Sequence, residues 1–301
     1  MVTVCTYQRN ESLDRLLTAI RRNVDNLPPT VPVGVVVVDD NPDGAARSVC
    51  DRHLDGYPLG LHYRRSGEGN IAVARNVGLE TALPISDWVA MTDDDCEPVD
   101  SWLATYVAAQ AHTGADALTG PCAFDPGPAA PRWLTEQPFY DDGQLWLTDR
   151  QPLDFAATNN SFVRSSFLRE RPWLRFDPVL GVVGGEDVVF YRTAHAEGLD
   201  IVYSLPSRVV SHEPPGRATF RYQLRSKFWL GNTEYLTNAY LGDANKVRWL
   251  LLSVRRMLSA MARPLGRLLR GLDPQFRYAV ATAVRAAGSA SGVLGLRARH
   301  H

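Results

Sequence analysis

The chain has 301 residues, of which 45% are hydrophobic and 22% charged, and its formal net charge at pH 7 is −1. This length allows one large domain, or one domain with an appendage. The near-neutral charge excludes the broad positive field of a nucleic-acid-binding protein, so we expect no nucleic-acid partner. The four cysteines are scattered without a CxxC pair, which favours a reduced protein over a disulfide scaffold or zinc site. With neither a signal peptide nor an apolar run of about 18 residues, the pattern leads us to expect a cytoplasmic protein.

The first half of the chain alternates strand and helix patterns. Short apolar runs predict strands at residues 2–5, 33–38, 59–63 and 88–91. Helical patterns between them predict helices at residues 13–20, 45–54 and 70–82. This order predicts a doubly wound, mostly parallel α/β sheet, in which ligands bind beyond the carboxyl ends of the strands.

The second half is less regular. Residues 120–155 are rich in proline, glycine and aromatic residues, and we expect long loops there. A strand-like run follows at 155–163. Residues 184–187 are expected to open a helix that runs to about residue 196, with Gly198 as its stop. Apolar residues at 201–203 predict the last strand, and the chain continues through Val209 and Val210 to residues 211–215.

Three consecutive aspartates, Asp93, Asp94 and Asp95, follow the predicted strand at 88–91. Neighbouring carboxylates repel one another, so a fold keeps them together only through solvation or a cation. Their hard oxygen atoms suit Mg²⁺ or Mn²⁺, which are commonly held by one or two carboxylates together with substrate phosphates. A solvated acidic loop is the alternative, but the position at the end of a buried strand favours a divalent-cation site.

Six fragments occur in the order typical of one enzyme family. They are residues 4–9 (VCTYQR), 37–40 (VVDD), 74–78 (ARNVG), 93–95 (DDD), 185–187 (GED) and 211–212 (SH). With them the chain resembles the family 2 glycosyltransferases, which are inverting nucleotide-sugar transferases of the GT-A fold. The nearest similarity is to bacterial polysaccharide and natural-product transferases. The resemblance implies a catalytic domain at 1–235, with a nucleotide-binding half at 1–100 and an acceptor half at 101–235, and a helical tail at 236–301.

The resemblance also implies a nucleotide site. We expect Thr6 and Tyr7 beyond the first strand, with Tyr7 stacking on the base, and Asp40 accepting the imide hydrogen of that base. Arg9 and Arg75 are expected to contact phosphates, because guanidinium groups bind phosphate in bidentate fashion. A turn-forming role for Asp40 and surface ion pairs for the two arginines are the alternatives. Uridine diphosphate is the default carrier by resemblance, with thymidine and guanosine diphosphates as alternatives.

The triple aspartate contains the family's Asp-X-Asp pattern. By resemblance, Asp93 is expected to reach the ribose or the metal, and Asp95 to coordinate the ion that bridges the two phosphates. Asp94 is expected to support this nucleotide-binding turn. His212 matches a position that supplies a third metal ligand, although a purely structural histidine is the alternative. The bound ion would act as a Lewis acid on the leaving diphosphate.

Asp187 is our prediction for the general base, and Glu186 for a residue that orients the site or binds the acceptor. The dipole of the predicted helix lowers the pKa of Asp187, whereas desolvation and the neighbouring Glu186 raise it. Ordinary charges at a helix N-terminus are the alternative for both residues.

The acceptor is expected to be a hydroxyl of a saccharide, a lipid-linked molecule or a natural product. Asn159 and Asn160 are expected to hydrogen-bond sugar hydroxyls. Trp133 and Trp146 are expected to form a platform for a sugar ring, with core packing as an equal alternative.

Residues 247–272 combine large apolar side chains with arginines and contain no acid before Asp273. They predict a basic amphipathic helix, which suits an anionic membrane surface and would place the enzyme peripherally on the inner face of the cell membrane through residues 246–272. A helix docked on the catalytic domain or in a dimer is the alternative. Pro264 is expected to break or kink this helix.

Two other functions compete with glycosyl transfer. A nucleotidyltransferase acting on a sugar phosphate would also use carboxylates and a divalent metal, but it would normally carry a glycine-rich loop after the first strand. A catalytically silent sugar-nucleotide-binding module would need no base at Asp187.

Overall fold

The computed structural model describes residues 1–140 and 147–298, so Trp146 lies outside the described residues. The chain forms two compact units. The first comprises Met1–Asp125, Gly143–Gly181 and Glu186–His212, and the second comprises Pro126–Asp142, Val182–Gly185 and Glu213–His301. The predicted domain boundary at residue 235 falls inside α9 (Phe220–Tyr240), and the whole of this helix belongs to the second unit.

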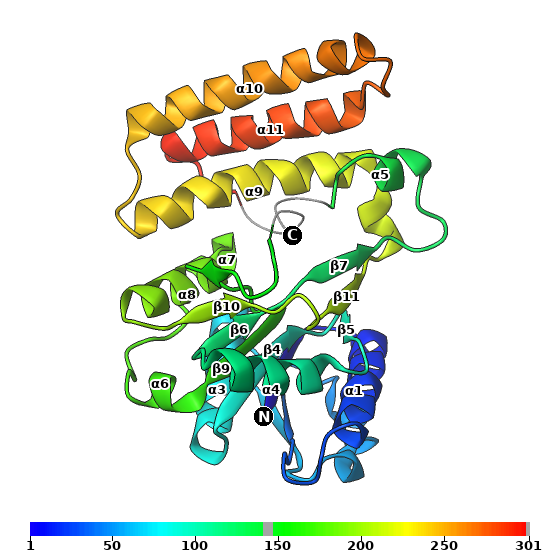
Figure 1. The fold of residues 1–301 in the computed structure, drawn as a ribbon, viewed down its shortest axis with the longest axis vertical. Helices are drawn as coiled ribbons and strands as arrows, with labels where there is room; N and C mark the ends of the chain where they lie inside the picture. Colours follow the sequence, from blue (N-terminus) through cyan, green and yellow to red (C-terminus); the bar gives the residue numbers. More distant parts are fainter. Residues whose placement is uncertain (141–146, 299–301) are drawn as a thin grey trace. The chain divides into compact units, whose positions relative to one another are not determined.

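An eight-stranded sheet with the order β3-β2-β1-β4-β9-β6-β10-β8 is the framework of the first unit (Figure 1). Its strands are β1 (Val2–Thr6), β2 (Val35–Asp39), β3 (Leu61–Arg65), β4 (Trp88–Asp93), β6 (Ala117–Thr119), β8 (Pro152–Leu153), β9 (Asn160–Arg164) and β10 (Ile201–Tyr203). Among the described residues, β9 runs antiparallel to β4 and β6, and β8 runs antiparallel to β10, whereas the other strand pairs of this sheet are parallel. The predicted mostly parallel α/β sheet is therefore confirmed.

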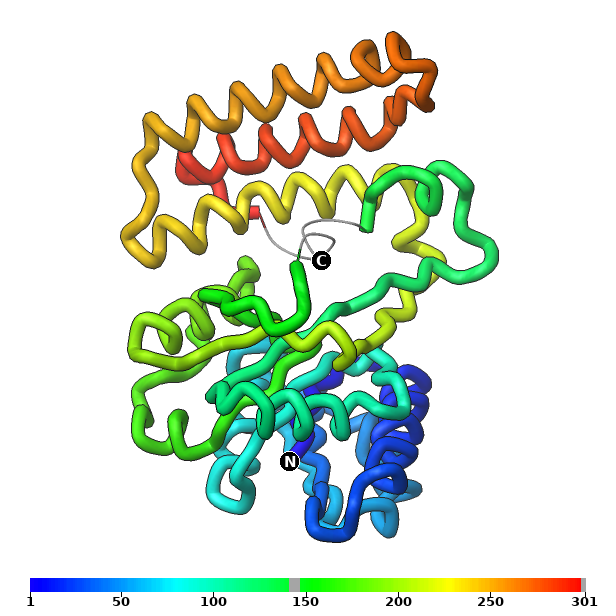
Figure 2. Tube along the Cα trace, viewed as in Figure 1, coloured from blue at the N-terminus to red at the C-terminus, as the bar shows by residue number. Residues whose placement is uncertain are grey.

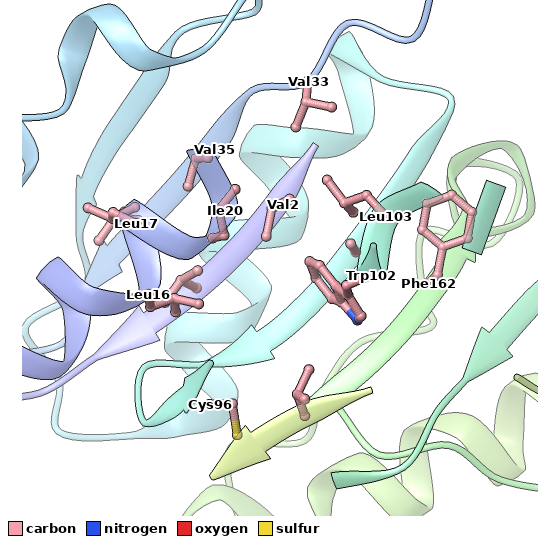
Figure 3. Close-up of a cluster of buried hydrophobic side chains, with 14 of the residues drawn as sticks. Val2, Leu16, Leu17, Ile20, Val33, Val35, Cys96, Trp102, Leu103 and Phe162 are labelled. Carbon is pink, nitrogen blue, oxygen red and sulfur yellow. The ribbon is translucent and has the colours of Figure 1, made fainter. Parts of the chain in front are cut away.

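Helices cover both faces of this sheet because its central strands are apolar on both sides. On one face, Val35 and Val37 pack with α1 (Asn10–Asp25) and α4 (Trp102–Thr113). On the other, Val36 and Val38 pack with α3 (Ile71–Ala82), α6 (Ser165–Arg169) and α8 (Glu186–Ala196). Figure 3 shows the first of these two cores, in which Leu16 of α1 is 1% exposed.

Shorter elements complete the first unit. The predicted helix at 45–54 is reduced to α2 (Arg47–Asp51), followed by a 3-10 turn at Leu54–Gly56. A separate three-stranded sheet has the order β5-β11-β7, formed by β5 (Cys96–Pro98), β11 (Val209–His212) and β7 (Cys122–Asp125). Its strand β5 begins two residues after Asp94. Because β5 pairs with β11, a strand that is distant in sequence lies next to the aspartate turn.

Three long helices dominate the second unit: α9, α10 (Lys246–Leu268) and α11 (Phe276–Val293). The short α5 (Arg132–Glu136) belongs to the same unit. The short α7 (Leu180–Val183) ends within this unit. Figures 1 and 2 show α11 between α9 and α10. Glycine allows α9 and α11 to approach closely, since a Cβ atom at Gly231 would lie 1.9 Å from the carbonyl oxygen of Arg285.

The predicted break at Pro264 is wrong, because α10 continues through this proline to Leu268. Pro264 is buried, and it lines a groove shared with α11. Among the described residues, no helix combines the length and the apolar character needed to cross a bilayer.

Candidate active site

The carboxyl ends of three neighbouring strands meet at one edge of the large sheet. In the parallel register, Thr6 of β1 lies beside Asp39 of β2, and Cys5 lies beside Asp93 of β4. The residues that follow these strands therefore share one edge. Tyr7 projects there with 48% of its surface exposed, which leaves its ring accessible for stacking.

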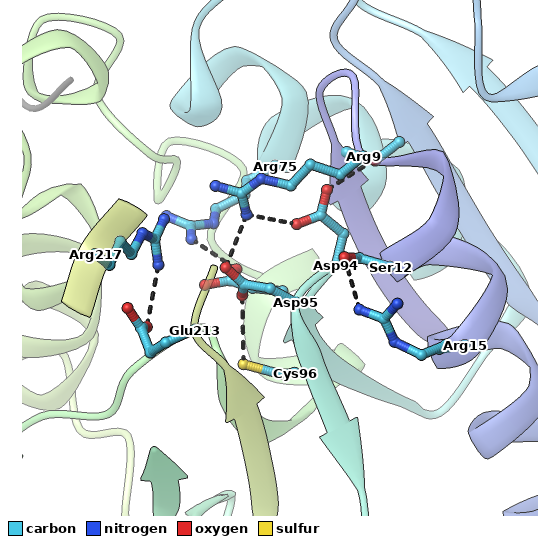
Figure 4. Close-up of polar contacts among 11 residues, drawn as sticks. Arg9, Ser12, Arg15, Arg75, Asp94, Asp95, Cys96, Glu213 and Arg217 are labelled. Carbon is cyan, nitrogen blue, oxygen red and sulfur yellow. Dashed lines mark hydrogen bonds and ion pairs between the residues drawn. The ribbon is translucent and has the colours of Figure 1, made fainter. Parts of the chain in front are cut away.

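Asp94 is the most buried member of the aspartate turn, at 4% exposed. Its two oxygens accept hydrogen bonds from Thr6 Oγ1 at 2.8 Å and from Arg9 Nη1 at 2.9 Å. The same Arg9 nitrogen lies 2.8 Å from Oδ2 of Asp95, and Figure 4 shows this arginine beside both carboxylates. Burial raises the pKa of Asp94 to about 6, although Arg9 and Thr6 act to lower it. Thr6 and Arg9 therefore stabilise the turn itself.

Arg75 joins two parts of the site. Its Nη2 lies 3.2 Å from Oδ1 of Asp93, and its Nη1 binds Oε1 of Glu186. The side chain is only 11% exposed. Burial acts to lower the pKa of Arg75, but the carboxylates of Glu186, Asp93 and Asp187 outweigh burial and raise it. In this structure, Arg75 pairs with carboxylates at a largely buried site and not at the surface, and its phosphate contact stays a prediction.

Asp187 lies in the first turn of α8, directly after the buried Glu186. Its Oδ1 accepts a hydrogen bond from the backbone N–H of Val188 at 2.8 Å. Burial first, and then the charge of Glu186, raise the pKa of Asp187 to about 6, while Arg75 acts in the opposite direction. A carboxylate with this pKa is ionised at neutral pH and is more basic than an ordinary aspartate, as a general base requires.

The two aspartates after β2 have different surroundings. Asp40 Oδ1 accepts hydrogen bonds from the hydroxyl of Ser66 and from the backbone N–H groups of Glu68 and Gly69, so it organises the loop at 66–69. Asp39 is fully buried and accepts from two backbone N–H groups and a tyrosine hydroxyl. The turn-forming role therefore belongs to Asp39, and Asp40 combines loop organisation with a place at the strand edge.

His212 lies beside the aspartate turn, because its backbone N–H donates to the carbonyl oxygen of Asp95 at 3.0 Å. Its ring is held between two acids, with Nε2 at 3.0 Å from Glu97 Oε2 and Nδ1 at 3.3 Å from Asp125 Oδ2. Within the described ranges, no three His, Cys, Asp or Glu side chains are gathered in a geometry that could hold a metal ion. Asp93 and Asp95 nevertheless supply the hard oxygen atoms that a cation brought with a diphosphate requires.

The predicted acceptor residues lie in contrasting environments. Asn160 is fully buried, and its side chain makes four hydrogen bonds. Oδ1 accepts from Trp102 Nε1 and from the Tyr106 hydroxyl, and Nδ2 donates to the carbonyl oxygens of Pro121 and Ser207. These bonds use its full capacity and leave none for a sugar.

Asn159 is only half-buried, and its side chain has no hydrogen-bond partner in the described part of the chain. Trp133 belongs to the second unit, where its ring packs edge-on against Phe139 and Phe220 and beneath the guanidinium of Arg277. These contacts correspond to the core-packing alternative for Trp133. Asn159 remains the predicted acceptor residue with hydrogen-bonding capacity to spare.

Two asparagines in the predicted helix at 70–82 have structural roles that the sequence did not predict. Asn76 exchanges two hydrogen bonds with the backbone of Phe176, at 2.8 and 2.9 Å, and Asn70 donates to the carbonyl oxygen of Pro178 at 2.9 Å. These hydrogen bonds fix the segment that precedes α7 and α8. Asn76 stands in the recognised ARNVG fragment, but only the fold reveals its partner 100 residues away.

Comparison with known proteins identifies the family. A model of glycosyl transferase family 2 matches residues 1–171. The chain is 28% identical over 299 residues to the succinoglycan biosynthesis protein ExoM of Rhizobium meliloti, covering 98% of this chain and 93% of that protein.

Two solved structures share the fold. One is S. aureus TarS 1–349 in complex with UDP-GlcNAc, with a TM-score of 0.57 and 15% identity, covering 98% of this chain and 91% of that one. The other is GalNAc-T7 with UDP, GalNAc and Mn²⁺, with a TM-score of 0.53 and 17% identity, covering 79% of this chain and 49% of that one. These neighbours confirm the GT-A type of the α/β fold, and the family match disfavours the nucleotidyltransferase alternative. The chain belongs to glycosyltransferase family 2 and is a glycosyltransferase.

Proposed function

We propose that this glycosyltransferase moves a sugar from a nucleoside diphosphate to an acceptor hydroxyl with inversion, that it depends on a divalent cation, and that Asp187 is the general base. The observation that carries the proposal is the link through Arg75. One guanidinium binds both Asp93, in the Asp-X-Asp segment, and Glu186, which is bonded to Asp187. Arg75 thereby links the carboxylate proposed to bind the donor to the segment that carries the proposed base.

In this mechanism, the acceptor oxygen attacks the anomeric carbon from the side opposite the diphosphate. The new C–O bond forms as the bond to the phosphate oxygen breaks, and Asp187 takes the acceptor proton. The pKa of about 6 leaves Asp187 ionised at neutral pH and able to do so. Arg75 would keep Asp187 oriented relative to Asp93.

The donor side uses the aspartate turn and the loops beside it. Asp93 and Asp95 would hold Mg²⁺ or Mn²⁺, which when bound stabilises the negative charge of the departing diphosphate. Tyr7 would stack on the base, and Asp40 would accept its imide hydrogen. Uridine diphosphate is the proposed carrier, in keeping with the UDP-GlcNAc complex of TarS and the complex of GalNAc-T7 with UDP, GalNAc and Mn²⁺.

The proposed acceptor is a growing saccharide, in keeping with the succinoglycan biosynthesis role in the name of ExoM. An acceptor of this type carried on a lipid would place transfer at a membrane surface. Asn159 is the side chain we propose for contact with its hydroxyl groups.

Thermal unfolding with a panel of nucleoside diphosphates tests the donor assignment. A ligand that binds only the folded state raises its stability by RT ln(1 + [L]/Kd), about 2.7 kcal/mol at a hundredfold excess over Kd. We expect UDP with Mn²⁺ to raise the melting temperature more than UDP alone, dTDP or GDP. Asp95→Ala should remove the part that depends on Mn²⁺.

Release of UDP from a UDP-sugar in the presence of a saccharide acceptor then tests transfer. Wild-type protein should release UDP in an acceptor-dependent manner, and Asp187→Asn should bind UDP but not turn over. Full turnover by Asp187→Asn would remove Asp187 from the base role. Unchanged melting with every nucleotide would contradict the donor site.

A further inference from the structure

Helix α10 leaves a continuous apolar face in solvent. Seven of its large apolar side chains are between 51% and 69% exposed and recur every three or four residues, which places them along one side of the helix. They are Val247, Leu251, Val254, Leu258, Met261, Leu265 and Leu268. The residues of α10 that are buried, Ser253, Ala260 and Pro264, are small by comparison. The helix therefore directs most of its large apolar side chains outward.

An apolar groove between α10 and α11 continues this stripe. It encloses about 650 Å³, and every residue that lines it is apolar. Met261, Leu265 and Leu268 belong to both the stripe and the groove, and Phe276 and Val280 of α11 form the opposite wall. We call the stripe and the groove together the α10–α11 face. Figures 1 and 2 show these two helices side by side along their length.

Basic side chains border this face, and acids are nearly absent from its surroundings. Asp273 is the only acidic residue between 246 and 298, a stretch that contains nine arginines and one lysine. Arg248 and Arg255 are exposed and make no side-chain ion pair or hydrogen bond with the described residues. At 100° per residue, both project just beyond the edge of the stripe that carries Leu251 and Leu258. The border thus offers free positive charge beside exposed hydrocarbon.

We propose that the α10–α11 face binds the surface of an anionic lipid bilayer, with hydrocarbon chains against the stripe and in the groove and lipid phosphates at Arg248 and Arg255. The charges favour this partner over a second copy of the chain. A two-fold contact through the same face would bring two arginine borders together with only Asp273 to offset them. A bilayer instead supplies hydrocarbon beside negative headgroups, the two chemistries that this face combines.

This surface goes beyond the proposed transfer reaction, and vesicle binding by the full-length protein tests it without any catalytic readout. We expect the protein to sediment with vesicles of phosphatidylcholine and phosphatidylglycerol, and far less with vesicles of phosphatidylcholine alone. Added salt should release it, because exposed charges are screened. Equal recovery in the supernatant with both kinds of vesicle would overturn the proposal.

Paired variants assign the binding to this face. Leu258→Glu with Leu265→Glu should abolish sedimentation. Arg248→Ala with Arg255→Ala should weaken it by about tenfold or more, since each basic residue near an anionic surface contributes about 1 kcal/mol. Leu205→Glu, at a 45% exposed leucine in the other unit, is the matched control and should bind as wild type does. Because all these side chains are exposed, each variant should melt at the wild-type temperature.

Light scattering in the absence of lipid tests the competing possibility that a second copy of the chain covers the α10–α11 face. A wild-type monomer is expected. A wild-type dimer that becomes monomeric in the Leu258→Glu, Leu265→Glu variant, together with no sedimentation on anionic vesicles, would assign the face to a second copy and overturn the lipid proposal. Vesicle binding that survives in that variant would overturn it as well.

Discussion

The indole N–H of Trp229 donates to the carbonyl oxygen of Val183 at 2.8 Å, three residues before Glu186. The next residue, Gly184, has φ = +93°, and a Cβ atom there would lie 2.2 Å from Cζ2 of Trp229. A side chain at Gly184 is thus excluded both by backbone conformation and by the indole ring. Helix α9 consequently fixes the backbone of residues 183–185, which are joined covalently to the start of α8.

Trp229 is therefore expected to be a positioning residue for Asp187, the proposed general base. Trp229→Phe keeps an aromatic ring but removes the hydrogen bond, which should cost about 1 kcal/mol of stability. Because small misplacements of catalytic groups are costly, we expect kcat to fall by about tenfold while the donor KM stays unchanged. Trp249→Phe in α10 is the control, since Trp249 packs on Tyr235. Equal effects of the two substitutions on kcat would contradict this role.

Arg75 is expected to be essential for folding as well as for turnover. Arg75→Met leaves Asp93, Glu186 and Asp187 without their shared cation, and removal of one partner from a buried ion pair costs about 3–5 kcal/mol. Arg75→Lys keeps the charge but lacks the forked nitrogens that reach two carboxylates, so it should fold better than Arg75→Met and still lose most activity. Denaturant unfolding and kcat measure these effects. Arg64→Met, at an exposed site, should be neutral, and a neutral Arg75→Met would refute the bridging role.

The pKa of Asp187 predicts how activity depends on pH. A base with a pKa of about 6 is protonated below that value, so kcat should rise with pH through about 6 and then level off. The measurement is a pH profile of kcat at saturating donor and acceptor. A flat profile between about pH 5 and about pH 7 would show that Asp187 does not govern the rate.

The same residue should destabilise the folded protein at neutral pH. Its folded-state pKa of about 6 lies above the ordinary value of 3.8, so its favourable contribution is complete below 3.8 and is lost as pH rises through about 6. Asp187→Asn avoids this loss, and we expect it to be more stable than wild type by about 1–3 kcal/mol at about pH 8, with a smaller difference at about pH 5. Melting temperatures at the two pH values test the sign. A variant that is less stable at the higher pH would contradict it.

The two neighbouring asparagines should separate structure from acceptor binding. Asn160→Ala leaves four buried polar partners unsatisfied and should cost about 3 kcal/mol or more of stability. Asn159→Ala should change stability by less than about 0.5 kcal/mol but raise the acceptor KM. Denaturant unfolding and acceptor kinetics, measured on both variants, distinguish the two roles. An unchanged acceptor KM in Asn159→Ala would remove Asn159 from the acceptor site.

The edge of the large sheet was predictable because it follows from local patterns. Apolar runs end in polar residues at Thr6, Asp39 and Asp93, and parallel pairing then brings these ends together. The helix that carries Asp187 was also predictable, because Gly184 and Gly185 precede it and Gly198 follows it. The helices of the second unit were less predictable. Pro264 by itself favours a break, but in the structure α10 continues through this proline, which is buried and lines the groove shared with α11.

The partners of individual side chains were not predictable. His212 contacts Glu97 and Asp125, which lie 115 and 87 residues away and reach it only through the three-stranded sheet. Asn160 looked available for a sugar because no local signal reveals that Trp102 and Tyr106 on α4 satisfy it. Such contacts depend on strand pairing and helix packing between distant segments, which no short stretch of the sequence reveals.

The position of Arg75 constrains how this enzyme could be redesigned. A protein engineer who exchanged the segment around Glu186 to accept a new saccharide would also change the electrostatic partner of Asp93, since both acids share one guanidinium. In the proposed mechanism, a change of acceptor preference would therefore also affect donor binding, because Asp93 and Glu186 share the guanidinium of Arg75. Libraries that vary residues on both sides of Arg75 together, while keeping the arginine, should yield more folded variants than libraries that vary either side alone.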